Sequence, residues 1–226
     1  MNGEFTLIEV IWHGHACFEL KGNKAIVVFD PFEGLGIPEP KANADVVLCS
    51  HSHRDHNNFG PVLKKGGTVL EGFLGSRDVS GVSIKGIATF HDDVEGSQRG
   101  NNSVYVVQLD GLRFCHLGDL GHDLKGEHLM EIGEVDVLLT PVGGGPTIEP
   151  DLASSIVERL DPRIIVPMHY NADIPEQSDW ITTRLHKVDD FLESIDGNVE
   201  RLDGRSFRIT KDNLSNGRQI KVLSFT

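Results

Sequence analysis

Six consecutive residues of this chain, His51-Ser52-His53-Arg54-Asp55-His56, include four side chains that can bind a metal ion. They follow Val46–Cys49, an apolar run typical of a buried strand. In a helix, His51 and His53 would point in directions roughly 200° apart, whereas in extended chain they share one face and can reach one ion. Asp55 and His56 follow after a turn and can serve a second ion nearby. The segment therefore predicts a fold in which a buried strand ends at a metal site.

The alternative for this segment is a polar surface loop that happens to contain three histidines. Imidazoles held so close together without an ion would repel one another on protonation and would gain nothing in return. A metal site is therefore the better interpretation.

The size and composition of the chain suit a globular protein with a substantial core. Its 226 residues are 38% hydrophobic and 24% charged, which is too apolar for a disordered segment. No linker or low-complexity segment interrupts the sequence, so we expect one domain over residues 1–226. The three cysteines are far apart and form no CxxC pair, which argues against a disulfide framework and favours a reducing, cytoplasmic location.

The charge balance limits the partners. Lys and Arg number 21, Asp and Glu number 34, and the net charge is −13. Such an acidic chain repels phosphate backbones and anionic lipids, so we expect neither nucleic acid nor a membrane as a partner. Apolar stretches such as Ala25–Phe29 fall far short of the roughly 20 residues of a membrane span. We expect a small-molecule substrate, and the oligomeric state is left open.

Short apolar runs separated by turns dominate the first half of the chain, and helical spacing is more frequent in the second half. The predicted strands are Thr6–Trp12, Ala16–Leu20, Ala25–Asp30, Val46–Cys49, Thr68–Glu71, Val82–Ile87, Ser103–Leu109, Leu112–Leu117, Val135–Thr140, Arg163–Pro167, Phe207–Thr210 and Ile220–Phe225. The predicted helices are Glu149–Leu160 and Ile181–Ile195. This order predicts an α/β fold in which two packed sheets have helices outside.

Further metal-capable residues follow other predicted strands. The HxHxDH motif after a strand, together with these residues, resembles the signature of the metallo-β-lactamase superfamily along the whole chain. Asp30 resembles the early aspartate that supports the metal-binding loop from behind, and His91 resembles the third histidine of the first ion. Asp119 resembles the aspartate that bridges both ions, and His169 resembles the last histidine, on the second ion. The resemblance implies the αββα four-layer sandwich of this superfamily.

The sequences around these motifs are distinctive as well. They read WHGHACF at residues 12–18, HDD at 91–93, RGNN at 99–102 and PMHY at 167–170. These segments resemble a branch of predicted metal-dependent hydrolases related to the ascorbate-6-phosphate lactonases. The bridging position holds Asp119 rather than Cys, which speaks against the antibiotic-degrading β-lactamases. The resemblance implies a hydrolase of small esters, lactones, amides or phosphoesters.

The resemblance also implies how the ions are held and used. The implied ligands of two divalent ions are His51, His53, Asp55, His56, His91, Asp119 and His169. Their nitrogen and oxygen donors favour zinc and leave manganese or iron open. A metal-bound hydroxide would attack the substrate, and Asp55 or Asp119 would take up the proton.

Residues behind the ions or at the rim of the site are predicted from the same motifs. Besides Asp30, these are His15, Arg99 and Tyr170. Arg99 either turns over the pocket mouth or pairs with acidic residues of the rim. Tyr170 either faces the pocket or is a buried structural residue.

Two segments are expected at the rim of the site. The first is His91–Gly100, which has glycine hinges and would form a lid or rim loop. The second is the glycine-rich segment Val142–Thr147. His116 and His122 compete with His91 for the role of third histidine, and His116, inside a predicted strand, is assigned to the core.

Two other functions fit the same motifs. In a mononuclear iron oxidoreductase such as a thiol dioxygenase, Asp55 and His56 would not bind metal. A non-catalytic metal-binding protein would keep the ligands without turnover. The number of ions per chain separates the first from a two-ion hydrolase, and metal-dependent turnover separates the second.

Overall fold

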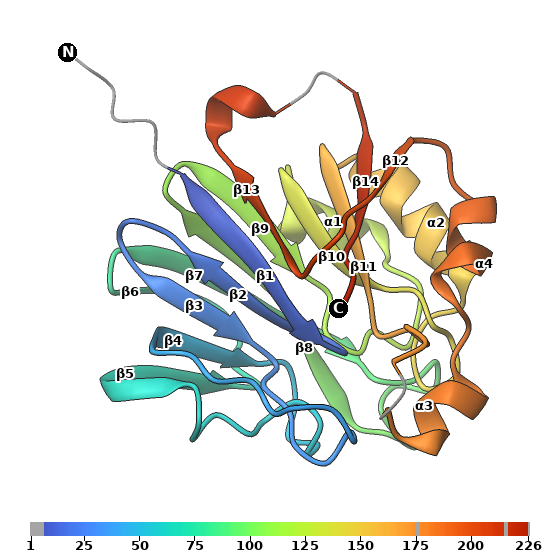
Figure 1. Cartoon of the computed structure of the whole chain (residues 1–226), viewed down its shortest axis with the longest axis horizontal. Helices are drawn as coiled ribbons and strands as arrows, with labels where there is room; N and C mark the ends of the chain where they lie inside the picture. Colours follow the sequence, from blue (N-terminus) through green and yellow to red (C-terminus); the bar gives the residue numbers. More distant parts are fainter. Residues whose placement is uncertain (1–6, 175–176, 215–216, 226) are drawn as a thin grey trace.

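Two β-sheets packed face to face form the framework of the protein in the computed structural model, which describes residues 7–174, 177–214 and 217–225 (Figure 1). The strands are β1 (Ile8–Gly14), β2 (Cys17–Lys21), β3 (Ile26–Phe29), β4 (Ala44–Cys49), β5 (Leu63–Glu71), β6 (Gly75–Val79), β7 (Val82–Phe90), β8 (Asn101–Leu109), β9 (Leu112–His116), β10 (Val137–Pro141), β11 (Ile164–Met168), β12 (Asn198–Arg201), β13 (Ser206–Ile209) and β14 (Gln219–Val222). The first sheet has the order β13-β1-β2-β3-β4-β5, and the second has the order β12-β14-β11-β10-β9-β8-β7-β6.

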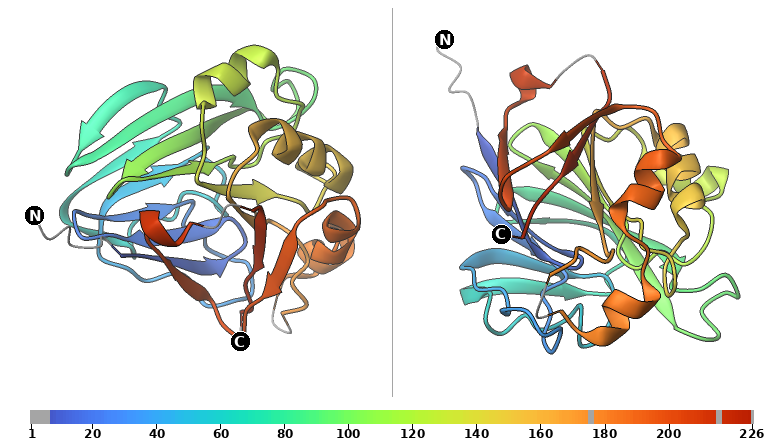
Figure 2. Two further views of the ribbon diagram at one scale, coloured as in Figure 1. Left: turned by 90° about the horizontal axis from the view of Figure 1, so that it is seen from above. Right: turned by 45° about the vertical axis from the view of Figure 1, so that its right-hand side comes forward.

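The outer faces of the two sheets are covered unequally. The helices are α1 (Gly126–Ile132), α2 (Pro150–Leu160), α3 (Asp179–Arg184) and α4 (Val188–Glu193), with a 3₁₀ turn at Lys211–Asn213. None in the described part of the chain is long and apolar enough to cross a membrane. Helices α1, α2 and α4 cover the second sheet (Figure 2). The first sheet is covered by α3 and by a loop whose Phe32, Leu35 and Ile37 belong to the same apolar cluster as Val28 and Val47. The predicted sandwich is therefore present, with a thinner layer over its first sheet.

Burial along the strands follows their place in the sheets. β1 alternates between buried and half-buried residues, the pattern of a strand with one face on a core. β10 and β11 are buried at every residue, as expected for parallel strands covered on both faces. A large apolar cluster joins both sheets to α2 and α4, and a smaller one lies between the first sheet and α3.

Most predicted elements are present with shifted boundaries. Thr6, the first residue of the first predicted strand, lies outside the described residues. Strands β6 and β12 and helix α1 were not predicted, because their sequences lack a regular apolar period. β12 is wholly exposed, β6 nearly so, and α1 buries only Ile132.

The prediction of one helix over Ile181–Ile195 is wrong. The chain forms α3 and α4 instead and leaves the helical conformation at Leu185, where φ is −101° and ψ is 142°. The backbone after Leu185 bonds to other segments: His186 N–H donates to Gly143 O at 2.8 Å, and His186 O accepts from Asn171 N–H at 2.9 Å. These bonds replace helical ones and hold the break beside the glycine-rich loop.

Candidate metal centre

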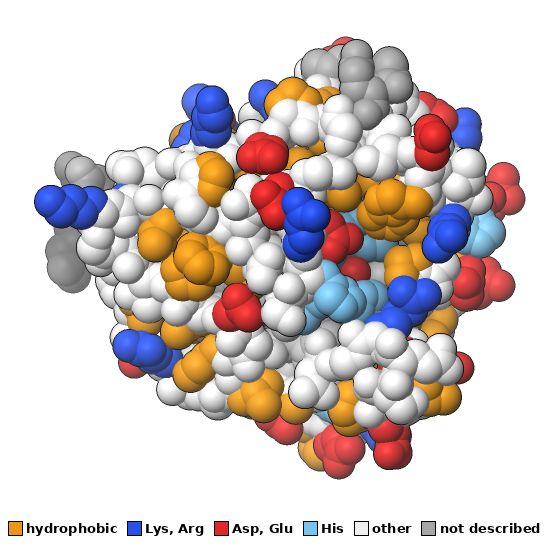
Figure 3. All heavy atoms as spheres, turned by 90° about the horizontal axis from the view of Figure 1, so that it is seen from below, with side chains coloured by type: hydrophobic (Ala, Val, Ile, Leu, Met, Phe, Trp, Pro, Cys, Tyr) orange, Lys and Arg blue, Asp and Glu red, His pale blue; other side chains and the backbone are white. Residues whose placement is uncertain are grey.

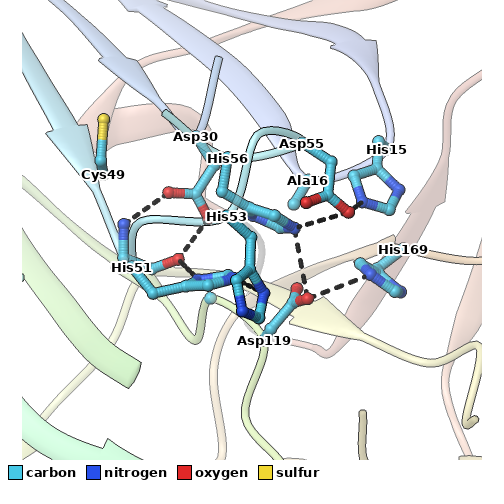
Figure 4. Close-up of polar contacts among 12 residues, drawn as sticks. His15, Ala16, Asp30, Cys49, His51, His53, Asp55, His56, Asp119 and His169 are labelled. Atoms are coloured by element: carbon cyan, nitrogen blue, oxygen red, sulfur yellow. Dashed lines mark hydrogen bonds and ion pairs between the residues drawn. The ribbon is translucent and has the colours of Figure 1, made fainter. Parts of the chain in front are cut away.

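The residues predicted to bind metal lie at the carboxyl ends of four strands. The loop after β4 carries His51–His56, and His91, Asp119 and His169 follow β7, β9 and β11 within three residues. These three strands run in the same direction in the second sheet, so their carboxyl ends lie along one edge. Figure 4 shows the side chains from both sheets converging at this edge. The fold therefore brings together all the predicted metal ligands.

The first group of ligand atoms consists of three histidine nitrogens. His51 Nε2 lies 3.0 Å from His53 Nδ1, and the ligand atoms of His51, His53 and His91 lie within 4.8 Å of one another. His91 Nε2 also lies 3.3 Å from Asp119 Oδ2. These four side chains enclose the first candidate metal position.

The second group contacts the same carboxylate oxygen as His91. Asp119 Oδ2 is 3.2 Å from His56 Nε2 and 3.2 Å from His169 Nε2. Asp55 Oδ2 lies 3.8 Å from His56 Nε2. Asp119 is thus between the two groups, where the predicted bridging ligand belongs.

The spacing of these atoms fits divalent metal ions. Donors at about 2.0–2.1 Å from a tetrahedral zinc ion are roughly 3.3 Å apart, close to the 3.0–3.3 Å found here. Several of the atoms are buried and have no hydrogen-bond partner among the described residues, namely His56 Nε2, His169 Nε2 and Asp119 Oδ1. Buried polar atoms without a partner are rare in folded proteins, and a bound ion would satisfy those that face it.

Asp30 orients one histidine of each group. Its buried carboxylate accepts hydrogen bonds from Ser50 N–H at 2.7 Å, from Ser50 Oγ–H at 2.7 Å and from His56 Nδ1–H at 2.9 Å. Ser50 Oγ in turn accepts from His51 Nδ1–H at 2.9 Å. Because Nδ1 carries the proton, both histidines present Nε2 to the ions. Asp30 therefore lies behind the metal-binding loop, as predicted. Ser50 also belongs to the site, although no sequence motif predicted it.

The side chain of Asn102 holds the backbone on which Asp119 lies. Asp119 N–H donates to Asn102 Oδ1 at 3.0 Å, and Asn102 Nδ2 donates to Leu117 O at 2.9 Å. Gly118 has a φ of +59°, and a Cβ there would lie 2.3 Å from Asn102 Oδ1 and 2.6 Å from Ser50 Cβ. Only glycine allows this close approach of the segment after β9 to the metal-binding loop.

The two histidines that compete with His91 have other contacts. His116 is fully buried, and its Nε2–H donates to Ala16 O at 2.9 Å. His122 Nε2 accepts a hydrogen bond from Phe90 N–H at 3.0 Å. His91 alone of the three presents a ring nitrogen to Asp119, which agrees with its predicted place.

The segment His91–Gly100 forms a rim loop around the carboxylate of Asp92. This carboxylate accepts hydrogen bonds of 2.7–3.0 Å from the backbone N–H groups of Val94, Gly96, Gln98 and Arg99. Burial raises the pKa of Asp92, but the four bonds outweigh it and lower the pKa to about 2. The Arg99 guanidinium has no ion-pair partner among the residues that the structure describes, so its predicted alternative, a pair with a rim acid, is not formed.

Burial and mutual contacts set the charges of the candidate ligands in the absence of an ion. Burial lowers the pKa of His51 to about 3, so this ring is neutral. Burial raises the pKa of Asp119, but His169 and His56 outweigh it and hold the pKa well below its usual range. Burial lowers the pKa of His56, but Asp119 and Asp30 outweigh it and raise the pKa well above its usual range.

The candidate metal centre opens into a pocket of about 420 Å³. Beside the candidate ligands, its lining includes Arg99, Gly145, Pro146, Trp180 and Arg184. Figure 3 shows histidine side chains at the floor of a hollow with basic side chains at its edge. Gly145 and Pro146 place the glycine-rich segment at the rim, as predicted. Trp180 and Arg184 come from α3 and belong to no motif, so the sequence provides no signal for them.

Tyr170 lies outside this pocket, and of its two predicted roles the structural one is found. Its ring is buried and stacks on Trp12 with a centroid distance of 5.7 Å. Burial raises the pKa of its hydroxyl. Tyr170 follows His169 directly, but its side chain belongs to the large apolar cluster.

His15 lies deeper than a rim residue. Its side chain is fully buried, and its Nε2 lies 3.5 Å from Asp55 Oδ2. Burial lowers the pKa of His15 to about 4. Burial raises the pKa of Asp55, but the contact with His15 and the charge of His56 outweigh it, so the pKa of Asp55 is below its usual range.

Known proteins are similar in sequence over most of this chain. Residues 9–169 match the family model of a β-lactamase superfamily domain. The chain belongs to the metallo-β-lactamase superfamily. It is 33% identical over 189 residues to a UPF0173 metal-dependent hydrolase of Thermoplasma volcanium, which covers 73% of this chain and 84% of that relative. A UPF0173 metal-dependent hydrolase of Thermococcus onnurineus is 33% identical over 201 residues, covering 76% of this chain and 89% of the relative.

Solved structures of this superfamily confirm the fold. A protein of Thermotoga maritima, provisionally assigned as a Zn-dependent hydrolase of the superfamily, matches with a TM-score of 0.79 and 36% identity over 97% of this chain and 100% of that one. The diiron β-hydroxylase CmlA of Streptomyces venezuelae matches with a TM-score of 0.54 and 14% identity over 76% of this chain and 46% of that one, which shows the fold alone. Because proteins of different chemistry share this fold, the reaction has to be argued from the site.

Proposed function

We propose that this metallo-β-lactamase superfamily protein is a hydrolase that holds two divalent ions and cleaves a small ester, lactone, amide or phosphoester. The observation that carries the proposal is the place of Asp119, whose Oδ2 lies 3.3 Å from Nε2 of His91, which belongs to the first group, and 3.2 Å from Nε2 of His56 and of His169, which belong to the second. When bound, two ions in these positions would lower the pKa of a water molecule and draw charge from a carbonyl or phosphoryl oxygen. The names of the relatives, metal-dependent hydrolases, support the reaction class.

We assign the proton transfer to Asp55 rather than to Asp119. Both side chains line the pocket, but that of Asp55 is 26% exposed, whereas that of Asp119 is 2% exposed and contacts three histidines. Asp119 would then serve to hold the two ions at a fixed separation.

The proposed substrate is small and carries a negative charge or none. Arg99 from the rim loop and Arg184 from α3 line the pocket, and neither guanidinium has an ion-pair partner within the described ranges. Trp180 provides an apolar wall beside them. The net charge of −13 opposes anions at long range, but the Debye length is roughly 8 Å at physiological salt, so the charges inside the pocket dominate there. A long nucleic acid would have to lie across the acidic surface, so we propose no nucleic acid as a substrate.

Zinc is the metal we propose for both positions. The ligand atoms are histidine nitrogens and carboxylate oxygens, which suit zinc and also accept manganese or iron. We further propose a cytoplasmic location, because the three cysteines show no pairing pattern in the sequence.

Elemental analysis of the purified protein, combined with a panel of small esters, lactones and phosphodiesters, tests the proposal. We expect two ions per chain and turnover that chelation abolishes and added metal restores. One iron per chain with oxidation of a thiol substrate would favour the mononuclear oxidoreductase. Bound metal without turnover of any substrate would favour a non-catalytic role.

A further inference from the structure

His15 is a buried histidine whose ring contacts the Asp55 carboxylate at 3.5 Å but has no well-formed hydrogen bond among the described residues. It lies in the turn between β1 and β2, its side chain is fully buried, and neither Nδ1 nor Nε2 is hydrogen-bonded within the described part of the chain. Burying a polar ring without partners is unfavourable unless another group satisfies it. An apolar side chain of similar size would fill the same space without that cost.

The ring of His15 faces the second group of candidate ligands. Its centroid lies 4.1 Å from that of His169 and 5.0 Å from that of His56. The ligand atoms of these three histidines lie within 4.8 Å of one another. His15 Nε2 also lies 3.5 Å from Asp55 Oδ2, and Figure 4 shows the ring of His15 beside Asp55 and near His169.

The backbone of the turn is held in place independently of the His15 ring. His15 O accepts hydrogen bonds from Trp12 Nε1–H at 3.0 Å and from His169 N–H at 3.2 Å. Ala16 O accepts from His116 Nε2–H at 2.9 Å. The φ of His15 is +53°, a left-handed conformation that is uncommon outside Gly and that Asn, Asp and His adopt more often than other residues. The hydrogen bonds of this turn do not involve the imidazole of His15, which lies beside the candidate metal ligands instead.

We propose that His15 is a nitrogen ligand of the second ion, in addition to the ligands that the superfamily motifs predict. The second position would then have three nitrogens, from His15, His56 and His169, and the carboxylates of Asp55 and Asp119. The first position has three histidine nitrogens and Asp119 alone. The two positions therefore differ in the number of oxygen donors, so they bind the same metal with different affinity. This inference rests on the two-ion site proposed above.

The test is the variant His15→Asn, because Asn tolerates the left-handed backbone while the imidazole is lost. His13→Asn is the matched control: His13 lies in β1, and its Nε2 contacts Glu19 Oε2 at 2.9 Å instead of the centre. The ions are titrated by isothermal calorimetry with zinc. The cobalt(II)-loaded proteins are then compared by proton NMR, in which each histidine that binds cobalt through one ring nitrogen gives a strongly shifted N–H signal from the other.

In His15→Asn we expect the first ion to bind as in the wild type and the second ion to bind at least 100-fold more weakly. At saturating cobalt, at least one shifted N–H signal of the wild type should be absent, whereas His13→Asn should keep both ions and every signal. A full set of shifted signals in His15→Asn overturns the assignment, whatever the affinity. A wild-type protein that binds a single ion overturns the two-ion proposal itself, and this is visible before any variant is compared.

Discussion

Removal of the Asp30 carboxylate should weaken the metal centre on both sides of Asp119. The carboxylate is fully buried and accepts three hydrogen bonds, two from Ser50 and one from His56 Nδ1–H. In Asp30→Ala these three donors lose their acceptor. A buried donor without a partner costs about 1–3 kcal/mol, so three of them predict a loss of roughly 3–9 kcal/mol in the free energy of unfolding. We expect the lower end, because the Ser50 hydroxyl can rotate to another acceptor.

The same change should lower the affinity for both ions. Asp30 holds His56 directly and His51 through Ser50 Oγ, and we assign these two histidines to different ions. Loss of such a supporting partner lowers metal affinity about 10–100-fold, which corresponds to about 1.4–2.8 kcal/mol per ion. The effect on the binding of each ion is thus smaller than the effect on folding, but it falls on both positions.

Two measurements separate these effects: urea unfolding of chelator-treated protein and zinc titration in competition with a chromophoric chelator. Asp45→Ala is the matched control, since Asp45 accepts a hydrogen bond from Ile26 N–H at 2.8 Å and pairs with Lys64 at the far end of β4. It should lower stability without changing zinc affinity. Wild-type zinc affinity in Asp30→Ala would refute the reasoning, because it would show that the histidines are oriented without the carboxylate.

Three further outcomes are expected. Asp119→Asn should retain less than one ion per chain by elemental analysis, because Asp119 contacts both ligand groups, and should keep the circular dichroism of the folded protein, because the core lies elsewhere. Two retained ions per chain would contradict the assignment of Asp119 as a ligand shared by both ions. Arg99→Ala and Arg184→Ala should each lower kcat/KM for a carboxylated ester about tenfold, the size of one lost charged hydrogen bond, and leave kcat/KM for the matching neutral ester unchanged. Arg54→Ala is the control, because the Arg54 guanidinium pairs with Glu33; equal losses on both esters would contradict the proposal that these arginines bind a negative charge of the substrate. Since the pKa of Asp92 is lowered to about 2, the Asp92 carboxylate should stabilise the rim loop fully above roughly pH 4 and lose this effect as the pH falls through 2, as followed by hydrogen exchange of the loop amides. In Asp92→Asn these amides should exchange faster already at neutral pH; the same exchange rates in the variant and the wild type would exclude this role of the carboxylate.

Local patterns predicted the first residues of the candidate metal centre, and the resemblance to the superfamily predicted the others. The two-residue spacing of His51 and His53 means a shared face only in extended chain, and the apolar run before them predicts that chain to be a strand. His91 and His169 were predicted from the order of the superfamily motifs, and in the structure each directly follows a strand. The types of side chain and their period along the chain are properties of neighbouring residues, so they can be read without knowledge of the fold.

The break at Leu185 shows what such patterns miss. The apolar spacing of Ile181–Ile195 is that of one helix, but the backbone of His186 bonds to Gly143 and Asn171 instead. Those partners come from other loops, and no period within the segment reveals them.

The residues that surround the candidate metal ligands also depended on tertiary structure. Ser50 acts only because Asp30, at the end of another strand, accepts its two hydrogen bonds. Arg184 lines the pocket only because α3 packs beside the metal-binding edge. His15 becomes a candidate ligand because the folded sheets bury its ring and bring it within reach of His169, while no residue of its own turn provides a partner for it. A residue type states which bonds a side chain can make, but the partners of a buried atom are supplied by distant segments, which only the packing of the two sheets brings together.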